Sequence, residues 1–242
     1  MLIKSILLLC ICTSVYSRVY KSLSFDWRDR GVVLPVPEPQ VCIDSAVINV
    51  LDSISAKLAL NTGSLISLSR QEVYDCQKDW CPCSKTNPVN SYAVISWLAN
   101  AHVSIDSETT YRTTGQCTHK CNTNATVVAR LGGYMTTGHG DQEDVLSTFI
   151  MNSPLVVDVN ANTTAWQTYR GGILDDPHCS NTMDAMDHSL LLVGYGSENG
   201  TDYWIARNSW GKNWGENGYV RVIQNKNMCG IGNRIAQPVI VG

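Results

Sequence analysis

Apolar positions recur at helical spacing in the first half of this chain of 242 residues. The strongest run follows Asp44, a residue type that caps helix N-termini well. It continues to the Asn61-Thr62-Gly63 stretch, where asparagine and glycine favour a helix end. Its apolar positions are Val47, Ile48, Val50, Leu51, Ile54 and Leu58. The spacing predicts a long helix that begins near Ser45.

Two shorter helices are predicted on either side of a loop. The segment Ser67–Cys76 carries Ser69 and, three residues later, Glu72, which is the spacing of a capping box. The segment Tyr92–Ala101 fits another short helix, and residues 77–90, which contain Cys, Pro, Asn and Lys, are predicted to form a loop. Further upstream, the prolines within residues 32–39 exclude a helix and predict an extended segment.

The second half of the chain has short apolar runs separated by glycine-rich turns. After one more helix candidate, Asp141–Met151, these runs predict four β-strands. The strands are Leu155–Val159, Ser189–Tyr195, Tyr203–Arg207 and Tyr219–Ile223. Helices early in the chain and antiparallel strands late predict an α+β protein with two subdomains and a cleft between them.

The first 17 residues have the layout of a secretory signal peptide, with Lys4, an apolar run from Ile6 to Cys12 and the small residue Ser17. The alternative is a buried N-terminal helix or strand. The run is too short to span a bilayer, and no later segment reaches about 18 apolar residues. We therefore expect residues 1–17 to be removed and residues 18–242 to form a secreted protein without a membrane span.

The charge of the chain excludes several classes of partner. Eighteen basic and 21 acidic residues give a net charge of −3, and only 16% of the residues are charged. A basic block that would bind nucleic acid and an acidic tail are both absent from the sequence. We expect no nucleic-acid partner and no cofactor.

Ten cysteines are present, and two of them, Cys10 and Cys12, lie in the predicted signal peptide. An even number in a secreted chain favours disulfides. The remaining eight are Cys42, Cys76, Cys81, Cys83, Cys117, Cys121, Cys179 and Cys229. A zinc site built from Cys81, Cys83, Cys117 and Cys121 is the competing interpretation; an oxidising compartment argues against it, so no metal is expected. The glycosylation triplets at Asn124, Asn162 and Asn199 agree with secretion.

Four segments of the chain carry distinctive motifs. Near the start of the expected mature chain is Phe25-Asp26-Trp27-Arg28, and Leu68–Cys76 reads LSRQEVYDC. Met186-Asp187-His188 is followed by Val193-Gly194-Tyr195-Gly196. Arg207-Asn208-Ser209-Trp210-Gly211 is followed by Trp214-Gly215-Glu216-Asn217-Gly218-Tyr219. Together these segments resemble the papain/cathepsin L family of cysteine peptidases over residues 24–242. The last two segments and their order are the most specific.

The resemblance implies a papain-like fold with a helical left subdomain, at about 33–127, and a β-barrel-like right subdomain, at about 128–242 together with the N-terminal strand. The nucleophile would lie at the start of the long helix, where the helix dipole lowers the pKa of a thiol. His188 would be the base, Asn208 would orient it, and Trp210 would shield their hydrogen bond. Asp187 and Trp214 would also belong to the cleft.

Serine occupies the nucleophile position of this pattern. Cys42 fits the disulfide cysteine that lies three residues before it, which places Ser45 at the catalytic position. A nucleophilic Cys42 would need a register slip and would strand a disulfide partner. The family relies on a thiolate–imidazolium pair, whereas a serine hydroxyl does not ionise against His188. Serine hydrolases use an anionic carboxylate to stabilise the imidazolium, and Asn208 is neutral.

The surroundings of Ser45 also differ from the family pattern. At the place of the oxyanion-binding glutamine stands Pro39, and Gln40 comes one residue late. Asp44 would oppose a developing anion, and Ala46 replaces a tryptophan. The segment Cys81–Asn87 has no glycine where the family pairs with peptide backbone. At the family's main specificity pocket stands Arg234, for which a surface position is the alternative.

The disulfides implied by the resemblance are Cys179–Cys229, Cys76 with Cys117 or Cys121, and Cys42 with Cys83 or Cys81. The two remaining cysteines would form an additional bridge. The resemblance also leads us to expect no propeptide, because the signal peptide runs almost directly into the mature segment; a wrongly assigned gene start is the alternative.

These observations predict a secreted, monomeric pseudopeptidase, in an extracellular or lysosome-like compartment, that binds a peptide, a protease inhibitor or another protein ligand. One alternative is a hydrolase that uses Ser45 and His188, or a silicatein-like protein. The other is residual cysteine-type endopeptidase activity.

Overall fold

The computed structural model describes residues 24–39, 44–77, 80, 89–100, 105–114, 117–122, 126–137 and 142–241. The α+β class is confirmed. Helical elements are η1 (Trp27–Arg30), α1 (Ser45–Thr62), α2 (Arg70–Cys76), α3 (Ser91–Asn100), α4 (Glu143–Phe149), α5 (Thr164–Gln167), η3 (Met183–Ala185) and η4 (Met228–Gly230). Strands are β1 (Phe25–Asp26), β2 (Leu131–Thr136), β3 (Leu155–Val159), β4 (Ile173–Leu174), β5 (His188–Glu198), β6 (Thr201–Arg207), β7 (Tyr219–Ile223) and β8 (Ile235–Ile240).

Helix α1 follows the sequence signals at both ends. The Asp44 carboxylate accepts hydrogen bonds from the backbone N–H groups of Ala46 and Val47. At the other end Gly63 adopts a left-handed conformation with φ of +78°, and its N–H bonds to the Ala59 carbonyl. These are the contacts that satisfy the free groups at helix ends.

The predicted capping box of α2 is half wrong. Ser69 caps the helix and accepts from the Glu72 N–H at 3.2 Å. Glu72 does not return a bond to Ser69, because the Ser69 N–H donates to the Asp106 carbonyl. The Glu72 carboxylate instead accepts from the Asp106 N–H at 2.7 Å. A contact between segments far apart in sequence has replaced the local one.

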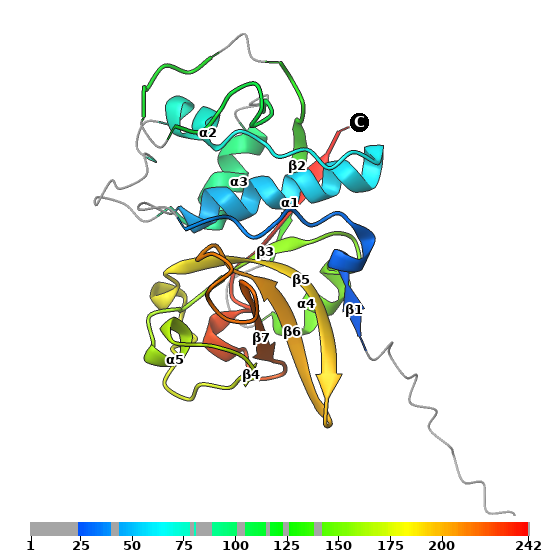
Figure 1. Ribbon diagram of the computed structural model, residues 1–242, viewed down its shortest axis with the longest axis vertical. Coiled ribbons are helices and arrows are strands. Elements are labelled where there is room, and N and C mark those ends of the chain that lie inside the picture. The colour runs from blue at the N-terminus through cyan, green and yellow to red at the C-terminus, as the bar shows by residue number, and fades with distance from the viewer. Residues whose placement is uncertain are drawn as a thin grey trace, which may run out of the picture.

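The strands form one sheet in the order β2-β8-β3-β5-β6-β7-β4, and β1 adds to β5. The neighbours pair antiparallel, except β4 and β7, which are parallel. Figure 1 shows α1, α2 and α3 gathered on one side of the molecule and the strands β4 to β7 on the other. The N-terminal end of α1 therefore lies between a helical subdomain and a sheet subdomain.

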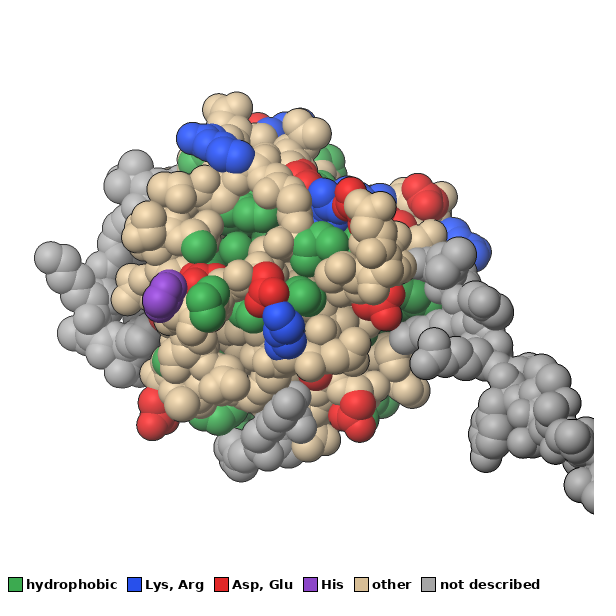
Figure 2. Space-filling view, turned by 90° about the horizontal axis from the view of Figure 1, so that it is seen from below, with side chains coloured by type: hydrophobic (Ala, Val, Ile, Leu, Met, Phe, Trp, Pro, Cys, Tyr) green, Lys and Arg blue, Asp and Glu red, His purple; other side chains and the backbone are tan. Residues whose placement is uncertain are grey.

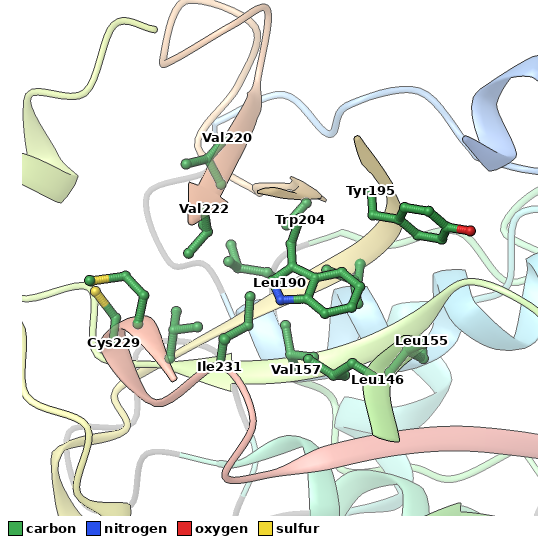
Figure 3. Packing of buried hydrophobic residues seen from close by; sticks show 14 of the residues in the cluster. Leu146, Leu155, Val157, Leu190, Tyr195, Trp204, Val220, Val222, Cys229 and Ile231 are labelled. Atoms are coloured by element: carbon green, nitrogen blue, oxygen red, sulfur yellow. The ribbon is translucent and has the colours of Figure 1, made fainter. Parts of the chain in front are cut away.

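Each subdomain has its own apolar core. In the sheet subdomain the indole of Trp204 lies among Leu190, Val157 and Ile231 (Figure 3). The helical core is built from α1, α2 and α3, and it reaches the sheet at Leu131, Val156 and Ala236. Alternation along β3 explains the division, since Leu155, Val157 and Val159 face one core and Val156 faces the other.

A buried polar seam joins the two cores. Arg207, with a fully buried side chain, forms an ion pair with Asp52 of α1. It also donates to the Leu34 carbonyl at 2.9 Å and to the Asn49 side chain at 3.3 Å. The Asn49 amide in turn donates to the Ser189 carbonyl at 2.8 Å. Helix α1 is thereby fixed against β5 and β6 close to the cleft.

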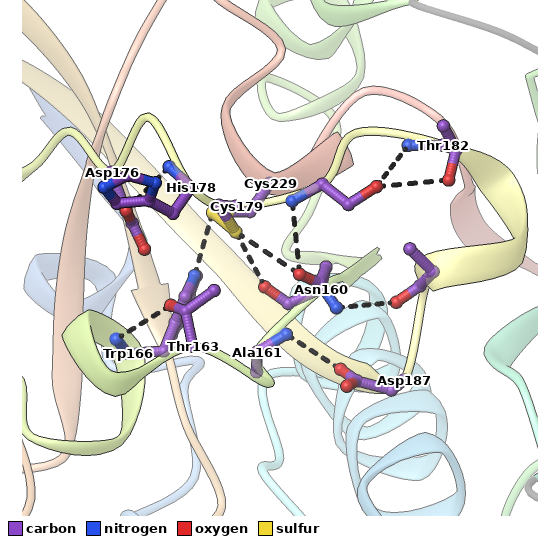
Figure 4. Close-up of a disulfide and its surroundings, with 12 residues drawn as sticks. Asn160, Ala161, Thr163, Trp166, Asp176, His178, Cys179, Thr182, Asp187 and Cys229 are labelled. Carbon is purple, nitrogen blue, oxygen red and sulfur yellow. Dashed lines mark hydrogen bonds between the residues drawn. A yellow bond between two sulfur atoms is a disulfide. The ribbon is translucent and has the colours of Figure 1, made fainter.

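Two disulfides are described. Cys179–Cys229 lies in the sheet subdomain, where the Trp166 indole N–H and the Asn160 carbonyl contact its sulfurs (Figure 4). Cys76 pairs with Cys121, the second of the two partners expected for it, and Cys117 is disulfide-bonded as well. Cys42, Cys81 and Cys83 lie outside the described residues.

Charged side chains of both signs are scattered over the face seen in Figure 2, rather than gathered into a patch of one sign. This distribution agrees with the small net charge of −3. Within the described residues, none of the helices has the length and apolar character needed to cross a membrane.

Candidate functional site

Strand pairing places a polar row at the floor of the cleft. Asp158 and Ser189 are partners across β3 and β5, and the Asp158 N–H donates to the Arg234 carbonyl at 3.1 Å. Asp158 alternates with Val157 and so shares the helical-core side of β3 with Val156. The Ser189 hydroxyl donates to Asp158 at 2.5 Å. Two paired strand positions, Asp158 and Ser189, and the residue before β8, Arg234, thus present polar groups at the floor of the cleft.

Ser45, the first residue of α1, meets this row. Its hydroxyl oxygen accepts a hydrogen bond from the Ser189 backbone N–H at 3.1 Å. No hydrogen bond joins the Ser45 hydroxyl to the His188 ring, although both residues are described and line one pocket. The polar contact of Ser45 with the sheet is therefore to the backbone and not to the imidazole.

His188 is held by Asn208. Its Nε2 lies 2.7 Å from the Asn208 Oδ1, which also accepts from the Ser209 N–H at 2.7 Å. Because that amide oxygen is an acceptor, Nε2 carries the proton and donates. The other ring nitrogen, Nδ1, is then the basic one in the neutral ring.

Two aromatic rings lie beside the His188–Asn208 pair. The Trp210 ring lies 4.8 Å from the His188 ring, and Trp214 lies edge-on to Trp210 at 5.2 Å. Trp214 itself is buried, and its indole N–H donates to the Trp166 carbonyl at 3.0 Å. Trp210 therefore lies against the His188 ring, and Trp214 supports Trp210 from the core.

Burial lowers the pKa of His188 from its ordinary value near 6.5. The hydrogen bond with Asn208 and the charges of Asp187 and Asp158 act in the opposite direction but do not reverse the shift. Neither carboxylate bonds to the ring: Asp187 accepts from the Ala161 N–H at 2.8 Å (Figure 4), and Asp158 is engaged by Ser189. His188 is a neutral imidazole at pH 7.

A pocket of about 240 Å³ opens beside Ser45 and His188. Arg234 lines it, and its guanidinium donates to the Asp158 carboxylate at 2.9 Å. Arg234 thus lies in the lining of this pocket, with its side chain 19% exposed. Lining residues are Ser45, Val89, Asn90, Asp158, Met183, Asp184, Met186, Asp187, His188, Ser189 and Arg234.

Comparison with known proteins identifies this arrangement. The family description "Papain family cysteine protease" matches residues 22–239. The chain belongs to this family. It is 32% identical over 221 residues to cysteine proteinase 3 of Dictyostelium discoideum, and 33% identical over 218 residues to human cathepsin O. These matches cover 90% and 88% of this chain but only 64% and 65% of the relatives, so the chain spans less than two thirds of their length.

Solved structures of papain-family proteins share the fold. Digestive procathepsin L 3 from the larval midgut of Tenebrio molitor superposes with a TM-score of 0.78 at 33% identity, covering 93% of this chain and 72% of that one. Procathepsin L2 from the same tissue gives 0.81 at 32% identity, covering 92% and 69%. The expected papain-like fold is confirmed.

Several expected features of a papain-family cleft are altered or lie outside the described residues. Pro39 packs on Gly211, directly after Trp210; a β-carbon on that glycine would lie 2.5 Å from the Pro39 ring. Pro39 has no side-chain donor. Ala46 is buried in the helical core. Gln40 and the segment Cys81–Asn87 lie outside the described residues.

The Asp44 carboxyl next to Ser45 has a strongly perturbed pKa. Burial raises it to about 6, against the opposing effect of the hydrogen bonds from Val47 and Ala46, and the charge of Asp158 raises it further. The carboxylates of Asp44 and Asp158 therefore repel each other electrostatically across the N-terminus of α1. A negative charge here disfavours any anion formed at Ser45.

Sequence reasoning missed Asp158 and Ser189. Both lie within strand-like apolar runs, LVVDV and HSLLLV, and a polar residue inside such a run carries a signal. A buried carboxylate must be paired, so Asp158 could have been assigned a cationic partner. The sequence does not show that this partner is Arg234, because the strand order that makes them neighbours is not a local property.

Proposed function

We propose that this papain-family chain is a secreted pseudopeptidase, a protein that binds a peptide or protein segment in its cleft without cleaving it. The observation that carries the proposal is the state of the central pair. The Ser45 hydroxyl is bonded to the Ser189 backbone, and His188 is a neutral ring paired with neutral Asn208.

Papain-type chemistry needs charge separation that this site does not favour. A thiolate at the helix N-terminus and an imidazolium stabilise each other before substrate arrives. A serine hydroxyl supplies no anion, so nothing at position 45 offsets the burial that keeps His188 neutral. The carboxylate next to position 45, Asp44, opposes anion formation rather than promoting it.

Serine-hydrolase chemistry is also poorly supported. It requires the nucleophile to donate to the histidine, and a carboxylate to hold the other ring nitrogen. Here the partner on Nε2 is the Asn208 amide, and Asp158 is engaged by Ser189 and Arg234. Pro39 replaces a side-chain donor to the oxyanion, a loss that typically lowers rates by about 10²–10³.

Secretion and a peptide-like ligand complete the proposal. Asn162 and Asn199 are exposed, and Asn199 lies at the turn between β5 and β6, so both are accessible to glycosylation; Asn124 lies outside the described residues. Relatives with digestive or cathepsin names support a secreted or lysosome-like compartment. We propose that the protein acts as a monomer, on a peptide, a protease inhibitor or another protein.

The test compares wild type, Ser45→Cys and the double variant Ser45→Cys/Pro39→Gln on fluorogenic peptide substrates. We expect no turnover by wild type, little by Ser45→Cys, and a gain of about 10²-fold when glutamine is added, as expected for one oxyanion donor. Full activity of Ser45→Cys alone would show that the oxyanion argument is wrong.

Two further measurements distinguish the alternatives. Wild type should not react with a thiol-directed epoxide, whereas labelling at Cys42 would favour residual cysteine-peptidase activity. Hydrolysis of an activated ester that disappears in Ser45→Ala would favour the hydrolase that uses Ser45 and His188. Neither result is expected.

A further inference from the structure

The bottom of the pocket beside Ser45 carries no net charge. Asp158 accepts from the Ser189 hydroxyl on one oxygen, and from Arg234 at 2.9 Å and the Ser91 N–H at 3.4 Å on the other. The side chains of Asp158 and Arg234 are 3% and 19% exposed. The two charges therefore cancel; Asp158 is hidden from a ligand, whereas part of the Arg234 side chain remains accessible in the pocket.

The mouth of the pocket is acidic. Asp184 and Asp187 line it, and both are exposed. Among the described residues neither forms an ion pair, and only one Asp187 oxygen is bonded, to the Ala161 N–H. With His188 neutral and the Asp158–Arg234 pair compensated, the lining carries an excess of two negative charges.

The wall that carries these carboxylates also offers apolar surface. Met183 directly precedes Asp184 and Met186 directly precedes Asp187 in the same short segment, and Val89 contributes from the helical subdomain. Flexible methionine side chains adapt to extended aliphatic chains. Long basic side chains bury an aliphatic stem while the charged head stays near water. The pocket thus combines the two surfaces that a lysine or arginine side chain requires.

We propose that this pocket selects a basic side chain, lysine or arginine, of the peptide or protein segment bound in the cleft. This inference rests on the proposed function, since it specifies the ligand of the same cleft. The stem lies against Met183 and Met186, and the head lies at the mouth between Asp184 and Asp187. A large apolar side chain would have to cover the Asp158–Arg234 pair, whose remaining guanidinium donors would then lose water.

An acidic side chain is the competing ligand, because the Arg234 guanidinium keeps donors beyond its bond with Asp158. Such a carboxylate would have to pass Asp184 and Asp187 and would meet an arginine whose charge is already compensated. Charge balance therefore favours the cation.

The experiment is an NMR titration of the wild-type protein with three synthetic peptides that differ only at a central lysine, norleucine or glutamate. Shift changes at Ser45, His188 and Ser189 report binding in the cleft. We expect the lysine peptide to bind about fivefold more tightly than the norleucine peptide at low salt, and the glutamate peptide to bind most weakly. The lysine preference should shrink at high salt.

Matched charge variants test the residues. Asp184 makes no side-chain hydrogen bond among the described residues, so Asp184→Asn should fold normally and lose most of the lysine preference. Asp202→Asn removes the same charge at an exposed position of β6 and should leave the preference unchanged. Equal effects of both variants would show that only net charge matters and would overturn the proposal.

The failures are distinguishable. Binding of all three peptides with glutamate equal to or tighter than lysine would overturn the basic pocket and leave the proposed peptide-binding function standing. An absence of shift changes with every peptide would overturn the proposed function, and this inference with it.

Discussion

The backbone N–H of Ser189 donates to the hydroxyl of Ser45 at 3.1 Å, across the boundary between β5 and α1. The residue next to His188 thus engages the side chain that would have to attack a substrate. No hydrogen bond joins the Ser45 hydroxyl to Nδ1 of His188 among the described residues. This relationship makes the protonation state of His188 the most direct measure of what the cleft can do.

His188 should titrate below 6.5 in the wild-type protein. Its folded-state pKa is lowered, so the unfolded chain binds the proton better, and folding stability falls as the pH drops below about 6.5. In Ser45→Cys a thiolate would stabilise the imidazolium, and the His188 pKa should rise. Heteronuclear NMR of the imidazole nitrogens measures both. A wild-type pKa above 6.5 would contradict the account of a neutral ring.

Asp44→Asn should stabilise the protein at neutral pH. Burial raises the pKa of Asp44 from 3.8 to about 6, so its contribution to stability is fully present below about 4 and is lost as the pH rises through 6. Asparagine is an equally good N-cap that carries no charge. Denaturant unfolding should show the variant gaining about 2–3 kcal/mol relative to wild type between pH 4 and pH 8. A difference that does not change with pH would contradict the assignment.

Arg207→Met should be strongly destabilising. The substitution leaves the buried Asp52 without its cation and frees the Leu34 carbonyl and the Asn49 amide oxygen. Breaking a buried pair in this way typically costs about 3–5 kcal/mol. The matched control is Lys226→Met, which removes an exposed ion pair with Asp175 and should cost less than about 1 kcal/mol. Similar losses in the two variants would show that the seam contributes no more than a surface pair.

Replacement of Cys179 and Cys229 by alanine should lower stability by about 2–4 kcal/mol, the usual effect of removing a disulfide. The bridge spans 50 residues, and Cys76–Cys121 spans 45, so the effects of the two bridges on the unfolded chain are nearly equal. Cys229 is buried and contacts the Trp166 indole, whereas Cys121 is exposed. Calorimetry should therefore show a larger loss of stability for the variant without Cys179 and Cys229 than for a variant without Cys76 and Cys121. A smaller loss of stability would contradict this reasoning.

The sequence predicted the elements whose signals are local. Asp44 and Gly63 bound α1 at the expected positions, and β3 and β7 begin and end at the expected residues. Strand β8 was not predicted, because IAQPVI contains a proline and a glutamine. Gln237 is tolerated in the interior because its amide donates to the Phe149 and Ser153 carbonyls, which are distant in sequence.

The residues of the site were likewise predictable only where their sequence signals are local. His188, Asn208 and Trp210 belong to short segments with a distinctive sequence, and the structure brings them together. The role of Asp158 depends on the register between β3 and β5 and on the position of Arg234 beside β3. Those relationships arise from the topology of the sheet and not from any single stretch of chain.

The covered His188–Asn208 pair has a consequence that does not involve chemistry. Asn208 is fully buried, and its side-chain oxygen accepts both from the His188 ring and from the Ser209 N–H. Replacing Asn208 by an apolar residue would leave the His188 Nε2–H and the Ser209 N–H without their acceptor beneath Trp210, and the fold would lose stability whether or not a bond is ever cut. A chain that no longer catalyses a reaction can thus keep the residues of a catalytic centre, since their hydrogen bonds also stabilise its interior.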